Sequence, residues 1–324
     1  MSSPARLGAF LLVTSSLAVA FACGGSGDPS EFASSSSTSG ASGSSGDNTS
    51  GGTSGFGTSG ASGGTSGTSG QDSGPCIAPV EMYIVFDKSG SMGEPFGNGA
   101  PGDCNIGDTK NSKWCKAINA LSGYLKSPSA KDQAAALQFF SGNDNPSCGS
   151  GDPYDKAATP ATGYTILPST AFDSALNATV PGGATPMEAA IRGLTKFTAA
   201  NRTPGKVTIG ILITDGDPQG CNTNIGQLAQ LIDQHYQATK IRTYVIGMNG
   251  ATFSNLEQLA GGGGAPPHAA TVGALTNACG NVTAPCKFWN VGDGDPAGFI
   301  QALAAIQEAS DGCKPGGGTV NPPK

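Results

Sequence analysis

The sequence predicts one α/β domain, built on a doubly wound, mostly parallel central sheet with helices on both faces. Short apolar runs alternate with amphipathic segments from position 79 onward, and this alternation is typical of a parallel sheet. Residues 24–75 are almost entirely Gly, Ser and Thr, so they bury too little apolar surface to fold. About 240 residues remain, between positions 76 and 313, which suits one medium-sized domain.

The strands are expected where apolar residues form continuous runs. Such runs indicate strands covered on both faces of a sheet. They occupy residues 82–86, 135–140, 207–213 and 241–246, with a short edge strand at 165–167 and a last strand at 288–291.

Helices are expected between these strands, where apolar residues recur at helical spacing. The stripe of Ile118, Leu121 and Leu125 is one example. The expected helices cover 113–126, a segment opening at Thr185, 224–237, 255–260 and 296–307, with a weaker one near 172–176. Two cysteine-bearing stretches, 92–112 and 141–162, are interpreted as loop insertions.

The first 22 residues are interpreted as an export signal. Arg6 precedes an apolar stretch that Ser15 and Ser16 interrupt, and this stretch is too short and polar for a membrane span. It ends Ala-Phe-Ala-Cys-Gly, which resembles a bacterial lipobox, although Ala20 stands where Leu is usual. The resemblance implies that Cys23 carries a lipid that anchors the chain to the cell envelope, most simply the outer membrane. Ordinary cleavage and secretion is the alternative.

The domain organisation follows from these boundaries. Residues 1–22 are the expected signal peptide, and 23–75 are the lipidated cysteine and a disordered tether. The folded domain is expected over 76–313, with a disordered tail at 314–324.

The chain has nine cysteines, an odd number that is awkward in an oxidising compartment. Lipid on Cys23 leaves eight, enough for four disulfides. Two pairs are preferred: Cys76 with Cys313, at the ends of the domain, and Cys279 with Cys286, which flank a short loop. No C-x-x-C spacing occurs, which argues against a zinc or thioredoxin-like site.

The formal net charge of -6 argues against nucleic acid, whose phosphates need a surplus of Lys and Arg. It argues equally against a polybasic membrane contact, so membrane association is expected only through the N-terminal lipid. Divalent cations and positively charged partners remain open.

Polar side chains follow the predicted strands at the point where they end. Asp87, Ser89 and Ser91 follow the first strand. Thr185 follows a Gly-Gly turn, and Asp215 follows the strand at 207–213. Ligands of doubly wound sheets bind at the carboxyl ends of the strands, so these residues are expected to meet there.

Three motifs in this order identify a family resemblance. They are D-x-S-x-S after the first strand, G-G-x-T-P before a helix, and I-T-D-G after a later strand. Together they resemble the von Willebrand factor A (VWA) domain with its metal-ion-dependent adhesion site, over about residues 79–310. The resemblance implies that five positions form the metal site: Asp87, Ser89, Ser91, Thr185 and Asp215.

The donor chemistry agrees with this implication. Carboxylates and hydroxyls are hard oxygen ligands, suited to Mg²⁺, with Ca²⁺ or Mn²⁺ as alternatives. Two aspartates cancel the charge of the dication, and the hydroxyls add none. The ion therefore still attracts a third carboxylate, which in the family comes from the partner.

Simpler roles compete at several positions. Ser89 and Ser91 are also suited to cap the following turn, and the segment 185–188 reads as a capping box with Pro at the first helical position. Asp217 and Asp295 are interpreted as turn or cap residues. Asp103 and Asp108 are candidates for a second ion site, although solvated loop carboxylates are the more common case.

The expected function is a binding module and not an enzyme. Only His235 and His268 are present, and the G-x-S-x-G match at 60–64 lies in the Gly/Ser segment, where no strained elbow forms. Metal-assisted hydrolysis lacks a general base beside the ion. We expect a cell-surface adhesion module whose ion bridges to an Asp or Glu carboxylate of a protein partner. The alternative is a structural envelope lipoprotein in which the metal only stabilises loops.

Overall fold

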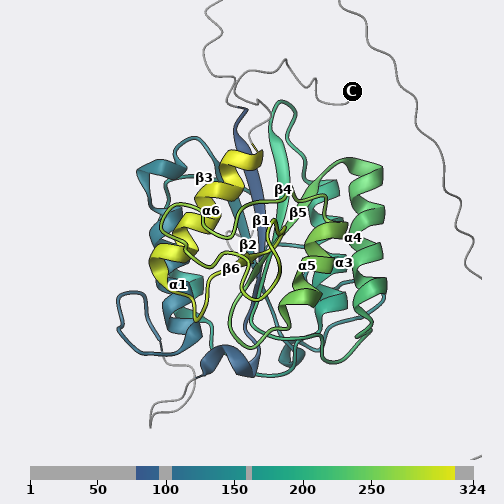
Figure 1. The fold of residues 1–324 in the computed structure, drawn as a ribbon, viewed down its shortest axis with the longest axis horizontal. Helices are drawn as coiled ribbons and strands as arrows, with labels where there is room; N and C mark the ends of the chain where they lie inside the picture. Colours follow the sequence, from purple (N-terminus) through teal and green to yellow (C-terminus); the bar gives the residue numbers. More distant parts are fainter. Residues whose placement is uncertain (1–77, 95–103, 158–162, 311–324) are drawn as a thin grey trace, which may run out of the picture. The chain divides into compact units, whose positions relative to one another are not determined.

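The computed structural model describes residues 78–94, 104–157 and 163–310 (Figure 1). The expected signal peptide, Cys23, the tether and the tail lie outside the described residues. Cys76, Cys313 and Asp103 also lie outside them.

Six strands form one sheet, in the order β3-β2-β1-β4-β5-β6. All neighbours pair in parallel except β3, which runs antiparallel to β2 at the edge. The strands are β1 (Val80–Asp87), β2 (Ala134–Phe140), β3 (Thr165–Ile166), β4 (Val207–Thr214), β5 (Arg242–Gly247) and β6 (Trp289–Asn290). This is the doubly wound, mostly parallel sheet expected from the alternating pattern.

The central position of β1 follows from its composition. All eight of its residues are buried, and it pairs with β2 on one side and with β4 on the other. A strand covered on both faces and both edges must be almost wholly apolar, and Met82–Phe86 meets that requirement. Strands β2 and β3 are added on one side of β1, and β4, β5 and β6 on the other. The order of the strands therefore reverses at β1, and Asp87 lies at the carboxyl end of this switch point.

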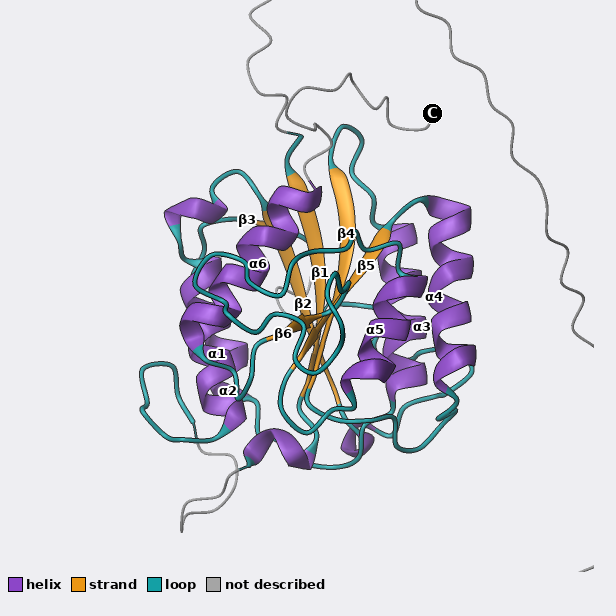
Figure 2. Ribbon diagram, in the orientation of Figure 1, coloured by secondary structure: helices purple, strands orange, loops and turns teal. Residues whose placement is uncertain are grey.

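Helices cover both faces of the sheet (Figure 2). One face carries α1 (Lys113–Leu125), α2 (Asp173–Ala178) and α6 (Pro296–Ser310), and the other carries α3 (Met187–Ala200), α4 (Ile225–Thr239) and α5 (Phe253–Gly262). A short 3-10 helix, η1 (Gly90–Gly93), follows β1. In the described part of the chain, no helix is long and apolar enough to cross a membrane.

Aromatic side chains join the helices to the central strand. The ring of Tyr83 stacks on that of Phe197 of α3, with ring centroids 3.8 Å apart. On the other face, Phe86 stacks on Trp114 of α1 at 5.0 Å. Each such ring is fully or almost fully buried, which contributes about 1.5–3 kcal/mol to stability.

Among the described residues, three disulfides hold the loops to this core. Cys279 and Cys286 form one, as expected from their spacing. The other two bonds, Cys104–Cys115 and Cys148–Cys221, pair four cysteines that the sequence left unassigned. Cys104–Cys115 attaches the first insertion to the start of α1, and Cys148–Cys221 joins the second insertion to the loop after β4.

Candidate metal centre

Two adjacent central strands bring the predicted aspartates together. Asp87 is the last residue of β1, and Asp215 directly follows the last residue of β4. The two strands pair in parallel up to Phe86 and Ile213, so their carboxyl ends lie side by side. Both aspartates are completely buried.

Hydrogen bonds connect four of the predicted residues in one network. Asp87 Oδ1 accepts the backbone N–H of Ser89 at 2.7 Å. Ser91 donates its hydroxyl to Asp215 Oδ1 at 2.8 Å, and the hydroxyl oxygens of Ser89 and Ser91 are 3.1 Å apart. The sequence missed Thr214, whose hydroxyl donates to Asp87 Oδ2 at 2.6 Å.

Thr185 lies close to Ser91 beside Gly216. A Cβ atom added to Gly216 would lie 3.3 Å from Thr185 Oγ1 and 3.7 Å from Ser91 Oγ. Both hydroxyls thus lie within 4 Å of the point that a side chain at position 216 would fill, and the glycine leaves that point open. Within the described residues Thr185 Oγ1 makes no hydrogen bond, so its lone pairs are available to a ligand.

The two aspartates create an electrostatic demand for a cation. Burial, followed by the negative charge of Asp215, raises the pKa of Asp87 to about 7, although hydrogen bonds from Thr214 and Ser89 partly oppose this rise. Neighbouring buried carboxylates cannot both ionise cheaply unless a positive charge lies between or beside them.

Lys113 supplies one such charge, and no sequence pattern predicted this role. Its ammonium forms an ion pair with Asp215 Oδ2 and donates to the carbonyl of Asn249 at 2.9 Å. One lysine offsets one of the two carboxylates, which leaves a net charge of about -1 when both are ionised. An all-oxygen donor set with residual negative charge fits a hard divalent cation.

The loops that carry these residues are tied to one another by their backbones. Gly90 N–H donates to the Gly183 carbonyl at 2.9 Å, and Gly182 N–H donates to the Lys88 carbonyl at 2.7 Å. Gly142 N–H donates to the Ala184 carbonyl at 2.7 Å. The loops after β1 and β2 therefore fix the turn that precedes α3.

Comparison of the sequence with models of protein families identifies the family of this chain. Residues 81–281 match the model of the von Willebrand factor type A domain. The chain belongs to this family. A search of curated proteins found no significant match.

Solved structures similar to this VWA domain share little sequence with it. Proximal thread matrix protein 1 from the mussel byssus is 14% identical, with a TM-score of 0.40, and the match covers 71% of this chain and 48% of that one. A second structure of that protein, with a zinc-occupied MIDAS motif, has a TM-score of 0.37 at 14% identity and covers 72% and 48%. The PilB minor pilin of Streptococcus sanguinis is 12% identical, with a TM-score of 0.43, and covers 72% and 61%. The chain thus spans about half to three-fifths of these structures.

The capping interpretation of Thr185 is wrong for this VWA domain. Helix α3 begins at Met187, with Pro186 at the N-cap, and no side chain caps it. Glu188 accepts the guanidinium of Arg192 and the backbone N–H of Asn222, so it is not available to close a capping box. The competing role of Ser89 is also absent, because Ser89 precedes η1 without a side-chain cap bond.

The other carboxylates have structural roles. Asp217 accepts hydrogen bonds from Thr252 and Asn255 at the start of α5. Asp295 accepts the backbone N–H of Gly298 at 3.0 Å and caps α6, as predicted. Asp108 accepts the backbone N–H of Asn105 within its own turn.

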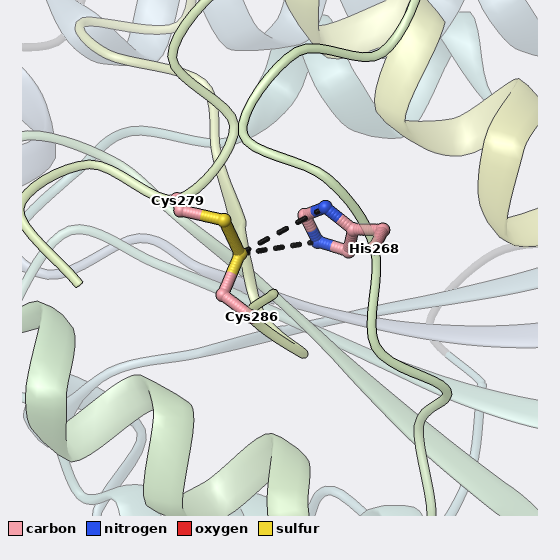
Figure 3. A group of neighbouring side chains, drawn as sticks. All are labelled: His268, Cys279 and Cys286. Carbon is pink, nitrogen blue, oxygen red and sulfur yellow. Dashed lines mark hydrogen bonds between the residues drawn. A yellow bond between two sulfur atoms is a disulfide. The ribbon is translucent and has the colours of Figure 1, made fainter. Parts of the chain in front are cut away.

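A second cluster, His268, Cys279 and Cys286, brings three metal-ligand side chains within 4.8 Å of one another (Figure 3). Its two sulfurs form a disulfide, so neither is a thiolate, the form in which cysteine binds metals. The ring of His268 stacks on Trp289, with centroids 3.7 Å apart. This arrangement packs the disulfide loop against the sheet edge.

Proposed function

We propose that this VWA domain binds a divalent cation through Asp87, Ser89, Ser91, Thr185 and Asp215, and uses it to hold an acidic group of a protein partner. Mg²⁺ is the expected ion, with Ca²⁺ and Mn²⁺ as alternatives, because all five side chains offer hard oxygen atoms. The bound ion would supply Lewis acidity toward a carboxylate of the partner.

One observation carries the proposal: two fully buried aspartates face each other across a set of hydroxyls at the carboxyl edge of the sheet. A purely structural role does not require two carboxylates here, because the charge of Asp215 raises the cost of ionising Asp87. A divalent cation removes that cost, since its charge equals that of the pair.

The surroundings of the site favour a binding surface. A hollow borders it beyond the end of β5, next to Asn249, which accepts the Lys113 ammonium. Its lining mixes polar and apolar residues: Asn249, Gly250, Ala251, Thr252, Phe253, Ser254, Asn281 and Val282. A partner that presents a carboxylate to the ion would have room here for its flanking residues.

The backbone ties among the loops argue against an ion that only stabilises them. The loops after β1 and β2 and the turn before α3 already bond to one another through Gly90, Gly182 and Gly142. We therefore place the binding role ahead of the structural envelope role.

Catalysis has less support. His235 of α4 forms a hydrogen bond with Thr198 of α3, and His268 stacks on Trp289. Neither histidine contacts Asp87 or Asp215 in the described structure, so no imidazole is placed as a general base beside the ion.

We also propose that the domain works outside the cytoplasm. Three disulfides are typical of an oxidising compartment, and the lipobox-like sequence at Cys23 would anchor the chain to the envelope. The Cys76–Cys313 bond stays a prediction of the same proposal.

The first test measures binding of the metal alone. Isothermal titration calorimetry of the full, oxidised chain should show one Mg²⁺ or Mn²⁺ site that Asp215→Asn abolishes. Asp233→Asn makes the same charge change on α4, where the Asp233 carboxylate accepts a hydrogen bond from Gln237, and should leave binding unchanged. Equal loss in both variants, or no ion bound by the wild type, would refute the metal site.

The second test separates binding of a partner from stabilisation of loops. Peptide libraries with Asp or Glu at one position are compared with Asn and Gln counterparts, in Mg²⁺ and in chelator. Selective retention of the acidic peptides in Mg²⁺ alone is expected. An ion that binds and stabilises the domain without any such retention would support the structural role instead.

A further inference from the structure

Lys113 occupies a position that is unfavourable for a lysine in two respects. It is the first residue of α1, where the helix dipole disfavours a positive charge. Its side chain is only 7% exposed, and lysines are almost never buried to this degree unless they are paired. The ion pair with Asp215 is the compensation for both costs.

The position of the ammonium is fixed from several directions. Ser112 caps α1 and the Cys104–Cys115 disulfide holds its first turn. The backbone N–H of Lys113 donates to the Glu94 carbonyl at 2.8 Å, in the loop that follows η1. Its ammonium also donates a hydrogen bond to the Asn249 carbonyl. Lys113 is therefore held in place by contacts that do not involve the metal ligands.

We propose that Lys113 is a built-in counter-charge of the cation site, which weakens binding of the divalent ion and strengthens the hold of the loaded site on an acidic ligand. This inference rests on the proposed function. It assigns to Lys113 a positioning and tuning role, because the lysine acts through Asp215 and does not ligate the ion.

The charge count explains both effects. Without Lys113, two ionised aspartates and a dication sum to zero, and the loaded site attracts a carboxylate only through the local field of the ion. With Lys113 the empty site carries about -1 and the loaded site about +1. The ion thus meets less attraction, while an incoming carboxylate meets more, in a partly desolvated place where charge interactions are strong.

The lysine also connects the site to the neighbouring hollow. Its ammonium spans from Asp215 to the Asn249 carbonyl, and Asn249 lines the hollow. A Cβ atom added to Gly250 would lie 3.2 Å from Lys113 Nζ, so the backbone of this loop closes over the ammonium. An acidic ligand bound in the hollow would therefore be attracted by the Lys113 ammonium, which lies just behind the Asn249 and Gly250 backbone.

A simpler role is that Lys113 only neutralises Asp215 for folding. That role predicts loss of stability on substitution but no gain in metal affinity. The counter-charge role predicts that metal affinity rises, because the competing positive charge has gone. The two roles therefore differ in whether metal affinity rises when the charge of Lys113 is removed.

The test uses the full, oxidised chain with three substitutions. Lys113→Met removes the charge, Lys113→Gln removes it while keeping a donor for Asn249, and Lys113→Arg keeps it. Calorimetry with Mn²⁺ alone should give at least about a tenfold tighter site in the Met and Gln variants, and wild-type affinity in the Arg variant. Acetate binding to the Mn²⁺-loaded protein, followed by paramagnetic broadening of its resonances, should weaken at least about fivefold in the two neutral variants.

Unchanged or weaker Mn²⁺ binding in both neutral variants, with the wild type binding the ion, would overturn the inference. So would acetate binding that does not weaken. If the wild type binds no ion, the proposed function fails instead, and the two failures are told apart by the wild-type titration. Should Lys113→Met not fold, the Gln variant carries the comparison.

Discussion

The raised pKa of Asp87 makes the stability of the ion-free domain depend on pH in a specific direction. Its folded value of about 7 exceeds the ordinary 3.8, so the folded state binds the proton more tightly than the unfolded state between these values. Stability from this group is therefore greatest at low pH, falls as pH rises from about 4 to about 7, and is constant above. Each pH unit in that window costs about 1.4 kcal/mol, so about 3 kcal/mol is lost between about pH 5 and pH 8.

The perturbation is Asp87→Asn in chelator, which removes the ionisation and keeps the shape. Asparagine loses one of the two hydrogen bonds that Asp87 accepts from Ser89 and Thr214, a cost of about 1 kcal/mol. The variant should therefore be less stable than the wild type at about pH 4 and more stable at about pH 8. If Asp87→Asn removes the ion site and yet stabilises the ion-free domain at about pH 8, the ionised, buried Asp87 carboxylate destabilises the folded state.

Urea unfolding at about pH 5 and about pH 8, with chelator and with saturating Mg²⁺, measures these differences. Mg²⁺ should stabilise the wild type more at the higher pH, because the ion binds the ionised aspartate, and should not stabilise Asp87→Asn. A wild type in chelator that loses no more stability than Asp87→Asn between the two pH values would refute the reasoning. Equal stabilisation by Mg²⁺ at both pH values would do the same.

Three further expectations follow from other contacts. Thr185→Val, which keeps the shape of a hydroxyl that makes no hydrogen bond in the described structure, should lower Mg²⁺ affinity at least about tenfold by calorimetry and change the unfolding free energy by less than about 1 kcal/mol. Gly262→Ala should destabilise the domain by about 1–3 kcal/mol in urea unfolding, because its Cβ would meet a backbone carbonyl of α4. The matched change Gly226→Ala, whose Cβ has ordinary contacts, should be neutral or stabilising by up to about 1 kcal/mol. Replacing Cys148 and Cys221 together by alanine opens a loop of sequence separation 73 and should cost about 4 kcal/mol by the same assay; a loss under about 1 kcal/mol would contradict the chain-entropy argument.

The strands and helices were predictable because burial on both faces leaves a strong pattern. The run that became β4 is apolar from Val207 to Ile213, and the structure extends it by one residue. The last strand was the exception: residues 288–291 were expected and only Trp289 and Asn290 pair with β5. On the N-terminal side, Cys286 pairs with His268 instead of β5. On the C-terminal side, Val291 N–H still donates to the Gly247 carbonyl at 2.9 Å, but the ladder ends there.

Side chains that follow strand ends were also predictable, because their place depends on the chain alone. Asp87, Ser89, Ser91 and Asp215 lie at one edge for that reason, whereas Thr185 lies in the turn before α3. Lys113 was not predictable, because it opens a helix far along the chain from Asp215 and looks like any solvated lysine of an amphipathic segment. The Cys148–Cys221 pairing depends on how two loops fold over the sheet, and no local pattern encodes that.

The distance along the chain between the two aspartates has a kinetic consequence. The Thr214 hydroxyl donates a hydrogen bond to Asp87, which lies 127 residues earlier in the sequence. The site therefore exists only after β1 and β4 have paired. Closing such a long loop comes late and slowly in folding. An ion that binds only the finished site should slow unfolding and leave the folding rate unchanged. The cation would then slow the unfolding of a completed domain, and it would not help to nucleate its folding.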